Sequence, residues 1–282
     1  MTLDNSWFSE PQPDSGTAFS LQITEKLHEE QSEFQKIEIF QTTHFGKLMV
    51  IDGYIMLTDR DNFIYHEMMS HPVLFSHPKP ENVLIIGGGD CGTLREVLKH
   101  DTVKLAQQVD IDERVTRLSE IHFPALCESN NDPRAELYFD DGIKWVKDAA
   151  ADSYDVIIVD STDPVGPGEV LFSTEFYQNC QRILKPGGMV VQQSESPLLH
   201  LDTILNPMHA RMRDAGHNHT LTFNFPQCVY PSGWWSCTVG GTTPLQQFRE
   251  QDAANKSFKT LYYNAEMHKA AMTLPEFMKS TS

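Results

Sequence analysis

The sequence predicts an α/β fold in which a small antiparallel β domain precedes a larger domain built on a parallel sheet. Residues 17–58 contain short stretches of alternating polarity with turn signals at Gly46 and Gly53, a pattern typical of antiparallel strands. From residue 82 onward, apolar runs, turns and helical stretches follow one another repeatedly, as in a parallel sheet with crossover helices. Together these patterns indicate an open α/β protein whose ligands bind at the carboxyl ends of the parallel strands.

The segment between the two patterns, residues 60–75, spaces its apolar residues as a helix does. Pro78 and Pro80 follow it and are expected to end the helix. We therefore expect two domains: residues 1–76, an N-terminal antiparallel β domain with a linking helix, and residues 77–282, the parallel-sheet domain.

The composition is that of an ordinary globular protein with a large excess of acidic residues. The 282 residues include 22 Lys and Arg against 39 Asp and Glu, a formal charge of −17. This charge argues against contacts with nucleic acid or an anionic membrane, because those need concentrated positive charge. The sequence contains no secretory signal and no apolar run near the ~20 residues that span a bilayer. We therefore expect a soluble, cytoplasmic protein with no nucleic-acid or membrane partner.

Cysteine and histidine usage predicts neither disulfide bonds nor a metal site. The five cysteines include no C-x-x-C pair, which suits free thiols in a reducing cytosol. The twelve histidines show no ligand spacing such as H-E-x-x-H. We expect no metal ion.

A glycine-rich turn follows the apolar run at residues 83–86. Residues 87–92 read GGGDCG and satisfy G-x-G-x-x-G between an expected strand and an expected helix, and Asp110 lies about twenty positions further on. This context favours a nucleoside ligand over a plain tight turn. Asp90 would repel a pyrophosphate but attract a sulfonium or ammonium, so an S-adenosyl ligand is favoured over the NAD-type alternative.

Further acidic residues follow other expected strands at the same edge. Asp141 follows residues 135–139, where it can contact an adenine or cap the next helix. Asp160 and Asp163 share one loop after residues 155–159. One carboxylate of this pair could deprotonate a substrate amine while the other holds a second ammonium, which supports direct alkylation of an amine by a sulfonium.

Residues 83–96, VLIIGGGDCGTLRE, resemble the signature of the spermidine/spermine synthase family, the polyamine aminopropyltransferases. Residues 58–69, 160–169, 230–233 and 262–268 also resemble segments of this family in its order. The resemblance covers nearly the whole chain and is closest to bacterial spermidine synthases.

The resemblance implies a Rossmann-like catalytic domain of the S-adenosylmethionine-methyltransferase type and a homodimer or homotetramer. It implies transfer of the aminopropyl group of decarboxylated S-adenosylmethionine to putrescine, giving spermidine and 5'-methylthioadenosine (EC 2.5.1.16). The donor is then a co-substrate, and no cofactor is expected. Three alternatives remain open: another amine acceptor (agmatine, cadaverine or spermidine), putrescine N-methylation, or a catalytically silent polyamine-binding homologue.

The resemblance also implies site residues. Asp160 is the expected general base. The expected polyamine contacts are Tyr65, His66, Asp90, Asp163 and Tyr230, with Gln193 and Glu195 as weaker candidates. The expected contacts to the methylthioadenosine part are Gln35, Gly87, Asp110, Asp141, Gly142 and Pro167. Two positions depart from the family pattern, since Asp110 stands where glutamate is usual and Cys91 where glycine is more common.

Overall fold

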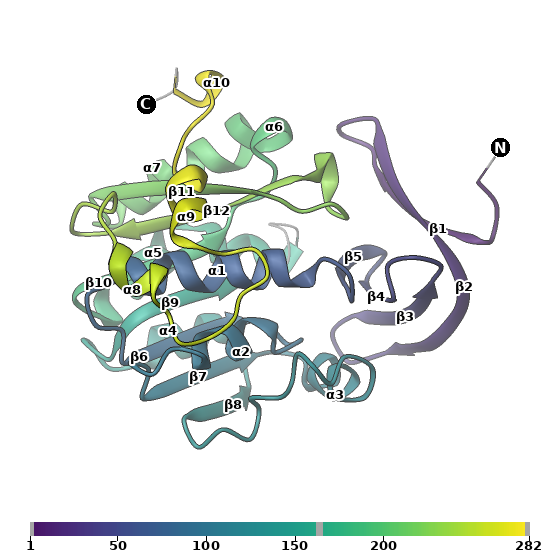
Figure 1. Ribbon diagram of the computed structural model, residues 1–282, viewed down its shortest axis with the longest axis horizontal. Coiled ribbons are helices and arrows are strands. Elements are labelled where there is room, and N and C mark those ends of the chain that lie inside the picture. The colour runs from purple at the N-terminus through teal and green to yellow at the C-terminus, as the bar shows by residue number, and fades with distance from the viewer. Residues whose placement is uncertain (1–2, 162–165, 280–282) are drawn as a thin grey trace.

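The computed structural model describes residues 3–161 and 166–279, which form two sheets joined by a long helix (Figure 1). The first sheet is an antiparallel meander in the order β1-β2-β3-β4-β5. Its strands are β1 Trp7–Gln12, β2 Thr17–Gln31, β3 Lys36–Thr42, β4 Lys47–Ile51 and β5 Tyr54–Thr58. The expected antiparallel domain is confirmed, and β1 is an additional strand that the sequence analysis did not predict.

The second sheet has the order β11-β12-β10-β9-β6-β7-β8. The five neighbouring strands β10, β9, β6, β7 and β8 pair in parallel, whereas β12 is antiparallel to β10 and β11 is antiparallel to β12. Its strands are β6 Asn82–Gly87, β7 Leu105–Asp110, β8 Ala135–Phe139, β9 Tyr154–Asp160, β10 Leu184–Gln193, β11 His219–Pro226 and β12 Trp234–Gly241. This confirms the Rossmann-like fold. Residues 185–188 lie inside β10, where the pairing with β9 shifts register between Leu184 and Met189.

Helices cover both faces of the larger sheet. They are α1 Asn62–Ser76, α2 Gly92–Leu98, α3 Glu113–His122, α4 Gly142–Asp148, α5 Thr174–Ile183, α6 Pro197–His200, α7 Asn206–Asp214, α8 Glu250–Ala254, α9 Ala265–Ala271 and α10 Glu276–Lys279. Short turns of other helix types occupy Gly166–Phe172, Leu201–Leu205 and Pro231–Gly233.

Strand β6 shows how the sheet separates two apolar layers. Val83 and Ile85 pack with α1 and α2, while Leu84 and Ile86 pack with α4, α5 and α7 on the other face. This follows from the alternation of side chains along a strand that is buried on both faces. The predicted boundary near residue 76 assigns α1 to the N-terminal domain, although α1 packs in the core of the larger sheet. This boundary stays a prediction.

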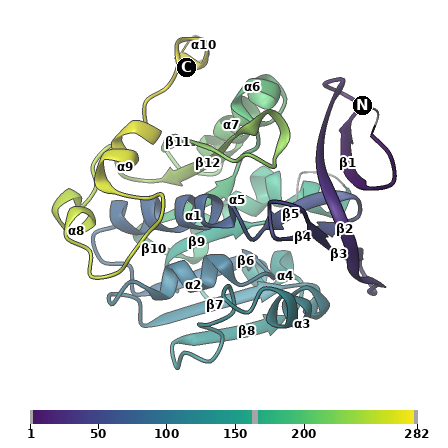
Figure 2. The ribbon, with the colours of Figure 1, turned by 45° about the vertical axis from the view of Figure 1, so that its right-hand side comes forward.

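The small sheet shares apolar cores with the larger domain. Ile39 and Met49 of the small sheet pack against Cys91 of the glycine-rich turn and Leu118 of α3. On its other side, Val229 from the β11–β12 connection lies among Phe40, Val50 and other side chains of the small sheet. Figure 2 shows this connection reaching toward β1 and β2. The small sheet therefore contacts the glycine-rich turn and α3 on one side and the β11–β12 connection on the other.

No helix within the described ranges is both long enough and apolar enough to cross a membrane.

Candidate active site

The site lies where the strand order of the larger sheet reverses, between β6 and β9. Gly87 at the end of β6 pairs with Asp160 at the end of β9, and Gly88 donates its N–H to the Asp160 carbonyl oxygen at 2.8 Å. Gly87 has φ +81°, and a Cβ atom there would lie 2.2 Å from that carbonyl oxygen. Glycine is therefore required at position 87 by both conformation and space.

The Asp160 carboxylate is held by two hydroxyl groups from different helices. Tyr65 of α1 donates to Oδ1 at 2.7 Å and Thr93 of α2 donates to Oδ2 at 2.6 Å. Burial and the nearby Asp90 raise the pKa of Asp160, whereas the two hydroxyl bonds oppose this rise. A carboxylate with a raised pKa is a better proton acceptor for a substrate amine.

Asp90 pairs with His66 beside this carboxylate. The His66 Nε2 atom lies 3.2 Å from Asp90 Oδ1, which also accepts the Gly92 N–H at 2.6 Å. Although burial acts to raise it, the pKa of Asp90 is lowered by the charge and hydrogen bond of His66. A Cβ atom on Gly92 would lie 2.2 Å from the His66 ring, so the glycine makes room for the histidine.

Asp110 ends β7 beside the glycine-rich turn. A Cβ atom on Gly89 would lie 2.8 Å from Asp110 Oδ2, and Asp110 Oδ1 accepts the Asp112 N–H at 2.8 Å. Burial, with added repulsion from Asp112 and Asp160, raises the pKa of Asp110 to about 6. This places an acid where the ribose of a nucleoside is expected in such folds.

Gln35 reaches the same edge from the small sheet. Its amide donates to Asp112 Oδ2 at 3.0 Å, which also accepts the Ser32 hydroxyl at 2.7 Å. Asp112 Oδ1 caps α3 by accepting the Arg114 N–H. The small sheet is thus fixed to the loop that follows Asp110.

Asp141 caps α4 by accepting the N–H groups of Ile143 and Lys144, so its expected capping role is confirmed. Its adenine contact stays a prediction. Gly142 lies against the larger sheet, because a Cβ atom there would be 2.6 Å from Ile86.

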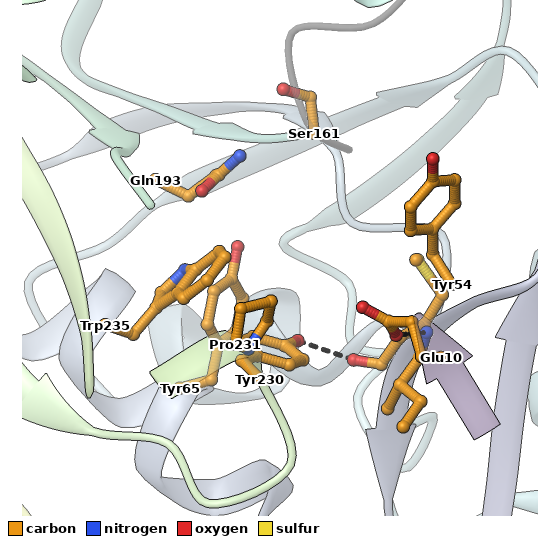
Figure 3. A pocket seen from close by; sticks show the side chains of 10 residues that line it. Glu10, Tyr54, Tyr65, Ser161, Gln193, Tyr230, Pro231 and Trp235 are labelled. Atoms are coloured by element: carbon orange, nitrogen blue, oxygen red, sulfur yellow. Dashed lines mark hydrogen bonds between the residues drawn. The ribbon is translucent and has the colours of Figure 1, made fainter. Parts of the chain in front are cut away.

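A cavity lies between Tyr65 of α1, Ser161 after β9 and the residues of the small sheet (Figure 3). Its lining residues are Glu10, Tyr54, Ile55, Met56, Tyr65, Ser161, Gln193, Tyr230, Pro231 and Trp235. Tyr230 closes it toward the small sheet by donating its hydroxyl to the Met56 carbonyl oxygen at 2.5 Å.

The cavity combines aromatic walls with acidic and amide groups. The ring of Tyr230 lies 5.8 Å from that of Tyr65 and 4.7 Å from that of Trp235, both edge-on. Glu10 is 4% exposed and accepts the Ile55 N–H through Oε2 at 2.6 Å. Aromatic faces and a buried carboxylate suit a cationic, partly apolar chain.

Gln193 is oriented by Glu195, its neighbour at the end of β10. The Gln193 amide donates to Glu195 Oε1 and accepts the Glu195 N–H, both at 3.2 Å. Glu195 is buried and has φ +64°, an uncommon conformation for a residue with a side chain. Gln193 lines the cavity, whereas Glu195 is not among its lining residues.

The structure brings together Tyr65, His66, Gly87, Asp90 and Asp160, and it places Asp110, Gln35, Tyr230 and Gln193 around them. Asp163 lies outside the described residues. Pro167 lies in the turn Gly166–Phe172, and its side chain is also outside the description.

Sequence reasoning missed Glu10, Thr93 and Trp235. The spacing of Trp235, Cys237 and Val239 is a strand signal that could have placed Trp235 on a sheet. Glu10 and Thr93 gave no local signal. Within residues 3–161 and 166–279, no cluster of three or more His, Cys, Asp or Glu side chains is arranged to hold a metal ion.

The fold is Rossmann-like, of the S-adenosylmethionine-methyltransferase type, and its acidic site lies at the switch point of the sheet, where proteins of this class bind ligands. Comparison with known proteins gives the family. Residues 62–250 match the model of the spermine/spermidine synthase domain, and residues 6–59 match that of the spermidine synthase tetramerisation domain. The chain belongs to the spermine/spermidine synthase family.

Two relatives illustrate this membership. A polyamine aminopropyltransferase of Thioalkalivibrio sulfidiphilus is 66% identical over 99% of this chain and 98% of its own length. One from Nitrosococcus oceani is 60% identical over 100% of this chain and 99% of its own length.

Two crystal structures of spermidine synthases are similar throughout, each at 34% identity. One, in complex with the transition state analogue AdoDATO, has a TM-score of 0.93 and covers 100% of this chain and 96% of that chain. The other, from Thermotoga maritima, has a TM-score of 0.92 and covers 100% of this chain and 95% of that chain.

Proposed function

We propose that this polyamine aminopropyltransferase is a spermidine synthase, which transfers the aminopropyl group of decarboxylated S-adenosylmethionine to putrescine. The observation that carries the proposal is the half-buried Asp160 carboxylate, which is held by Tyr65 and Thr93 and lies near Asp90 and a cavity that suits a cation. The similarity to solved spermidine synthases supports the same substrates.

In the proposed reaction, Asp160 accepts a proton from one amine of putrescine. An alkylamine has a pKa near ~10.4, so it must lose a proton before it can attack. The freed nitrogen attacks the CH2 group bonded to the sulfonium sulfur, a C–N bond forms and the C–S bond breaks. The bonding electrons return to sulfur, which leaves as the neutral thioether 5'-methylthioadenosine.

The acceptor would extend from Asp160 along the aromatic wall of Tyr65, Tyr230 and Trp235. Its second ammonium would then reach Glu10 and Gln193, while Asp163 is proposed from sequence to hold the polyamine. On the donor side, Asp110 would accept from the ribose hydroxyls. Contacts to the rest of the nucleoside are proposed for Gln35, Gly87, Asp141, Gly142 and Pro167.

The proposed donor is a co-substrate, and the reaction needs no cofactor. We further propose a cytoplasmic homo-oligomer, a dimer or tetramer, assembled through the small sheet. This assembly is supported by the match of residues 6–59 to the family's tetramerisation domain.

The direct test supplies decarboxylated or ordinary S-adenosylmethionine with putrescine, cadaverine, agmatine or spermidine, and measures the products by mass spectrometry. We expect methylthioadenosine and spermidine in equal amounts, with putrescine the best acceptor by kcat/KM. Formation of N-methylputrescine would instead identify a putrescine N-methyltransferase. A higher kcat/KM with another amine would identify an aminopropyltransferase for that acceptor. No product with any pair would support the silent homologue.

The matched variant is Asp160→Asn, which keeps the shape of the side chain but removes the proton acceptor. Loss of a general base should lower kcat about 100-fold or more. Binding of methylthioadenosine should persist, which separates the loss of chemistry from the loss of the fold. A kcat within a few-fold of wild type would exclude the general-base role.

A further inference from the structure

The His66–Asp90 pair is arranged so that a ligand can reach only one of its members. Asp90 keeps 17% of its side-chain surface exposed, whereas His66 keeps 2%. The Nε2 atom of His66 lies 3.2 Å and 3.3 Å from the two carboxylate oxygens of Asp90. A cation in the site therefore contacts Asp90, and His66 lies behind it.

The two ring nitrogens of His66 have different surroundings. Nε2 faces Asp90, whereas Nδ1 is buried and has no hydrogen-bond partner among the described residues. A neutral ring with its proton on Nε2 would still donate to Asp90. The proton on Nδ1 can thus leave without breaking a hydrogen bond within this pair.

The charges around His66 come from three other elements. Asp90 in the glycine-rich turn and Asp160 on β9 favour the charged ring, whereas Arg95 on α2 disfavours it. The Tyr65 ring on α1 lies edge-on at 5.6 Å. Burial acts to lower the pKa of His66, but Asp90 and Asp160 outweigh it and raise that pKa above its usual value.

We propose that the donor's aminopropyl ammonium and the Nδ1 proton of His66 compete for the negative charge of Asp90, so that donor binding expels this proton. The inference rests on the proposed function and adds one placement to it: the aminopropyl ammonium of the donor lies at Asp90, the acidic residue of the glycine-rich turn. Once a second positive charge shares Asp90, the buried imidazolium loses part of its stabilisation and burial favours the neutral ring. His66 is then a positioning residue that selects donors with a cationic end.

Competition fixes the sign of the pH dependence. Below the pKa of free-enzyme His66, the charged ring partly neutralises Asp90, so donor affinity weakens as the pH falls. Above that pKa, Asp90 is available and affinity reaches a plateau, until the ammonium itself loses its proton near ~10.4. Between the His66 pKa values of the bound and free enzyme, the donor Kd changes up to about tenfold per pH unit.

The experiment counts the protons released on binding, by titration calorimetry at pH 6.5 in phosphate and in an imidazole buffer. The probe is decarboxylated S-adenosylmethionine without acceptor. The matched ligand is the dimethylsulfonium analogue of methylthioadenosine, which has the same nucleoside and sulfonium but no aminopropyl chain. Both ligands carry the same nucleoside, so any protons that Asp110 releases on binding are the same for both. They cancel when the proton release of one ligand is subtracted from that of the other.

We expect the donor to release more protons than its matched ligand, because Asp90 and Asp160 raise the pKa of free His66 and the second positive charge lowers it again. In His66→Gln, which keeps an N–H donor for Asp90 but cannot titrate, this difference should vanish. His209→Gln, a histidine bonded to Thr222 outside the site, should keep the wild-type value.

Equal proton release by the two ligands in the wild-type protein would overturn the inference, and this comparison does not depend on whether His66→Gln folds. Unchanged proton release in a folded His66→Gln variant would overturn it as well. Failure of the donor to bind at all would instead overturn the proposed function, so the two failures are distinguishable.

Discussion

The Tyr65 hydroxyl donates a 2.7 Å hydrogen bond to Oδ1 of Asp160, across the interface between α1 and the end of β9. Thr93 bonds the other carboxylate oxygen, so both acceptor atoms are oriented before any substrate arrives. Both bonds favour the charged carboxylate and limit the rise in its pKa that burial and Asp90 cause. Hydroxyl groups on two helices therefore orient the Asp160 carboxylate and oppose the effects of burial and Asp90 on its pKa.

Tyr65→Phe should raise the pKa of Asp160 further, because it removes one of these bonds. The acidic limb of the kcat/KM profile should move to higher pH by roughly one unit, the equivalent of about 1.4 kcal/mol. Thr93→Val should move it in the same direction. Tyr177→Phe is the control, since it loses a buried bond to Gln192 away from the site. An acidic limb that stays in place in both site variants would contradict this account.

Gly87→Ala should destabilise the protein more than Gly53→Ala, although both glycines have positive φ, +81° and +89°. Both variants share a conformational penalty of about 1–2 kcal/mol. Only at Gly87 would the new Cβ meet a backbone atom, the Asp160 carbonyl oxygen at 2.2 Å, while nothing lies within 4 Å at Gly53. Overpacking should add about 1–3 kcal/mol at Gly87. Urea unfolding checks this, and equal losses would show that the loop relaxes freely.

Glu10→Gln should raise the KM for the diamine tenfold or more and leave the KM for the donor unchanged. The amide can still accept the Ile55 N–H, so the variant removes charge rather than the backbone contact. A charged hydrogen bond contributes about 1.5–3 kcal/mol, which corresponds to this range. Glu25→Gln, on the exposed side of the same sheet, is the matched control. An unchanged diamine KM in Glu10→Gln would place the second ammonium elsewhere.

Glu96 should make the stability of the fold depend on acidic pH. This buried carboxylate accepts from His71, Lys99 and Arg95, and although burial opposes it, the His71 and Lys99 contacts lower its pKa to about 2. Its contribution of about 3 kcal/mol is fully present above pH ~4.5 and is lost as the pH falls toward 2.

Glu96→Gln should therefore lower the free energy of unfolding by a few kcal/mol at pH 7, and the difference from wild type should shrink below pH ~4.5. Chemical denaturation over this pH range measures it. Glu276→Gln, in an exposed pair with Lys279, should change little. If the difference in the free energy of unfolding between wild type and Glu96→Gln stays constant with pH, the loss of stability comes from packing and not from the charge of Glu96.

Local signals in the sequence predicted the parallel strands and the glycine-rich turn. The antiparallel β11 was also open to prediction, because Leu221, Phe223 and Phe225 alternate with polar residues. Strand β1 was not, since it contains Pro11, pairs only with β2 and has mostly exposed or half-buried side chains.

The acidic part of the site was predictable because carboxyl ends of parallel strands meet at one edge. Thr93 and Glu10 were not, since each reaches the site only through tertiary packing, 67 positions from Asp160 for Thr93 and 45 from Ile55 for Glu10. The place of His66 behind Asp90 likewise depends on the space above Gly92.

Val229 belongs to the C-terminal half of the chain but is buried in the core of the small sheet. Tyr230, next to it, bonds the backbone of β5. The small sheet and the β11–β12 connection therefore pack as one structural unit. A chimera that takes its small sheet from a relative should take residues 227–233 from the same parent. Otherwise the two sides of the acceptor cavity come from different proteins and their contacting side chains do not match.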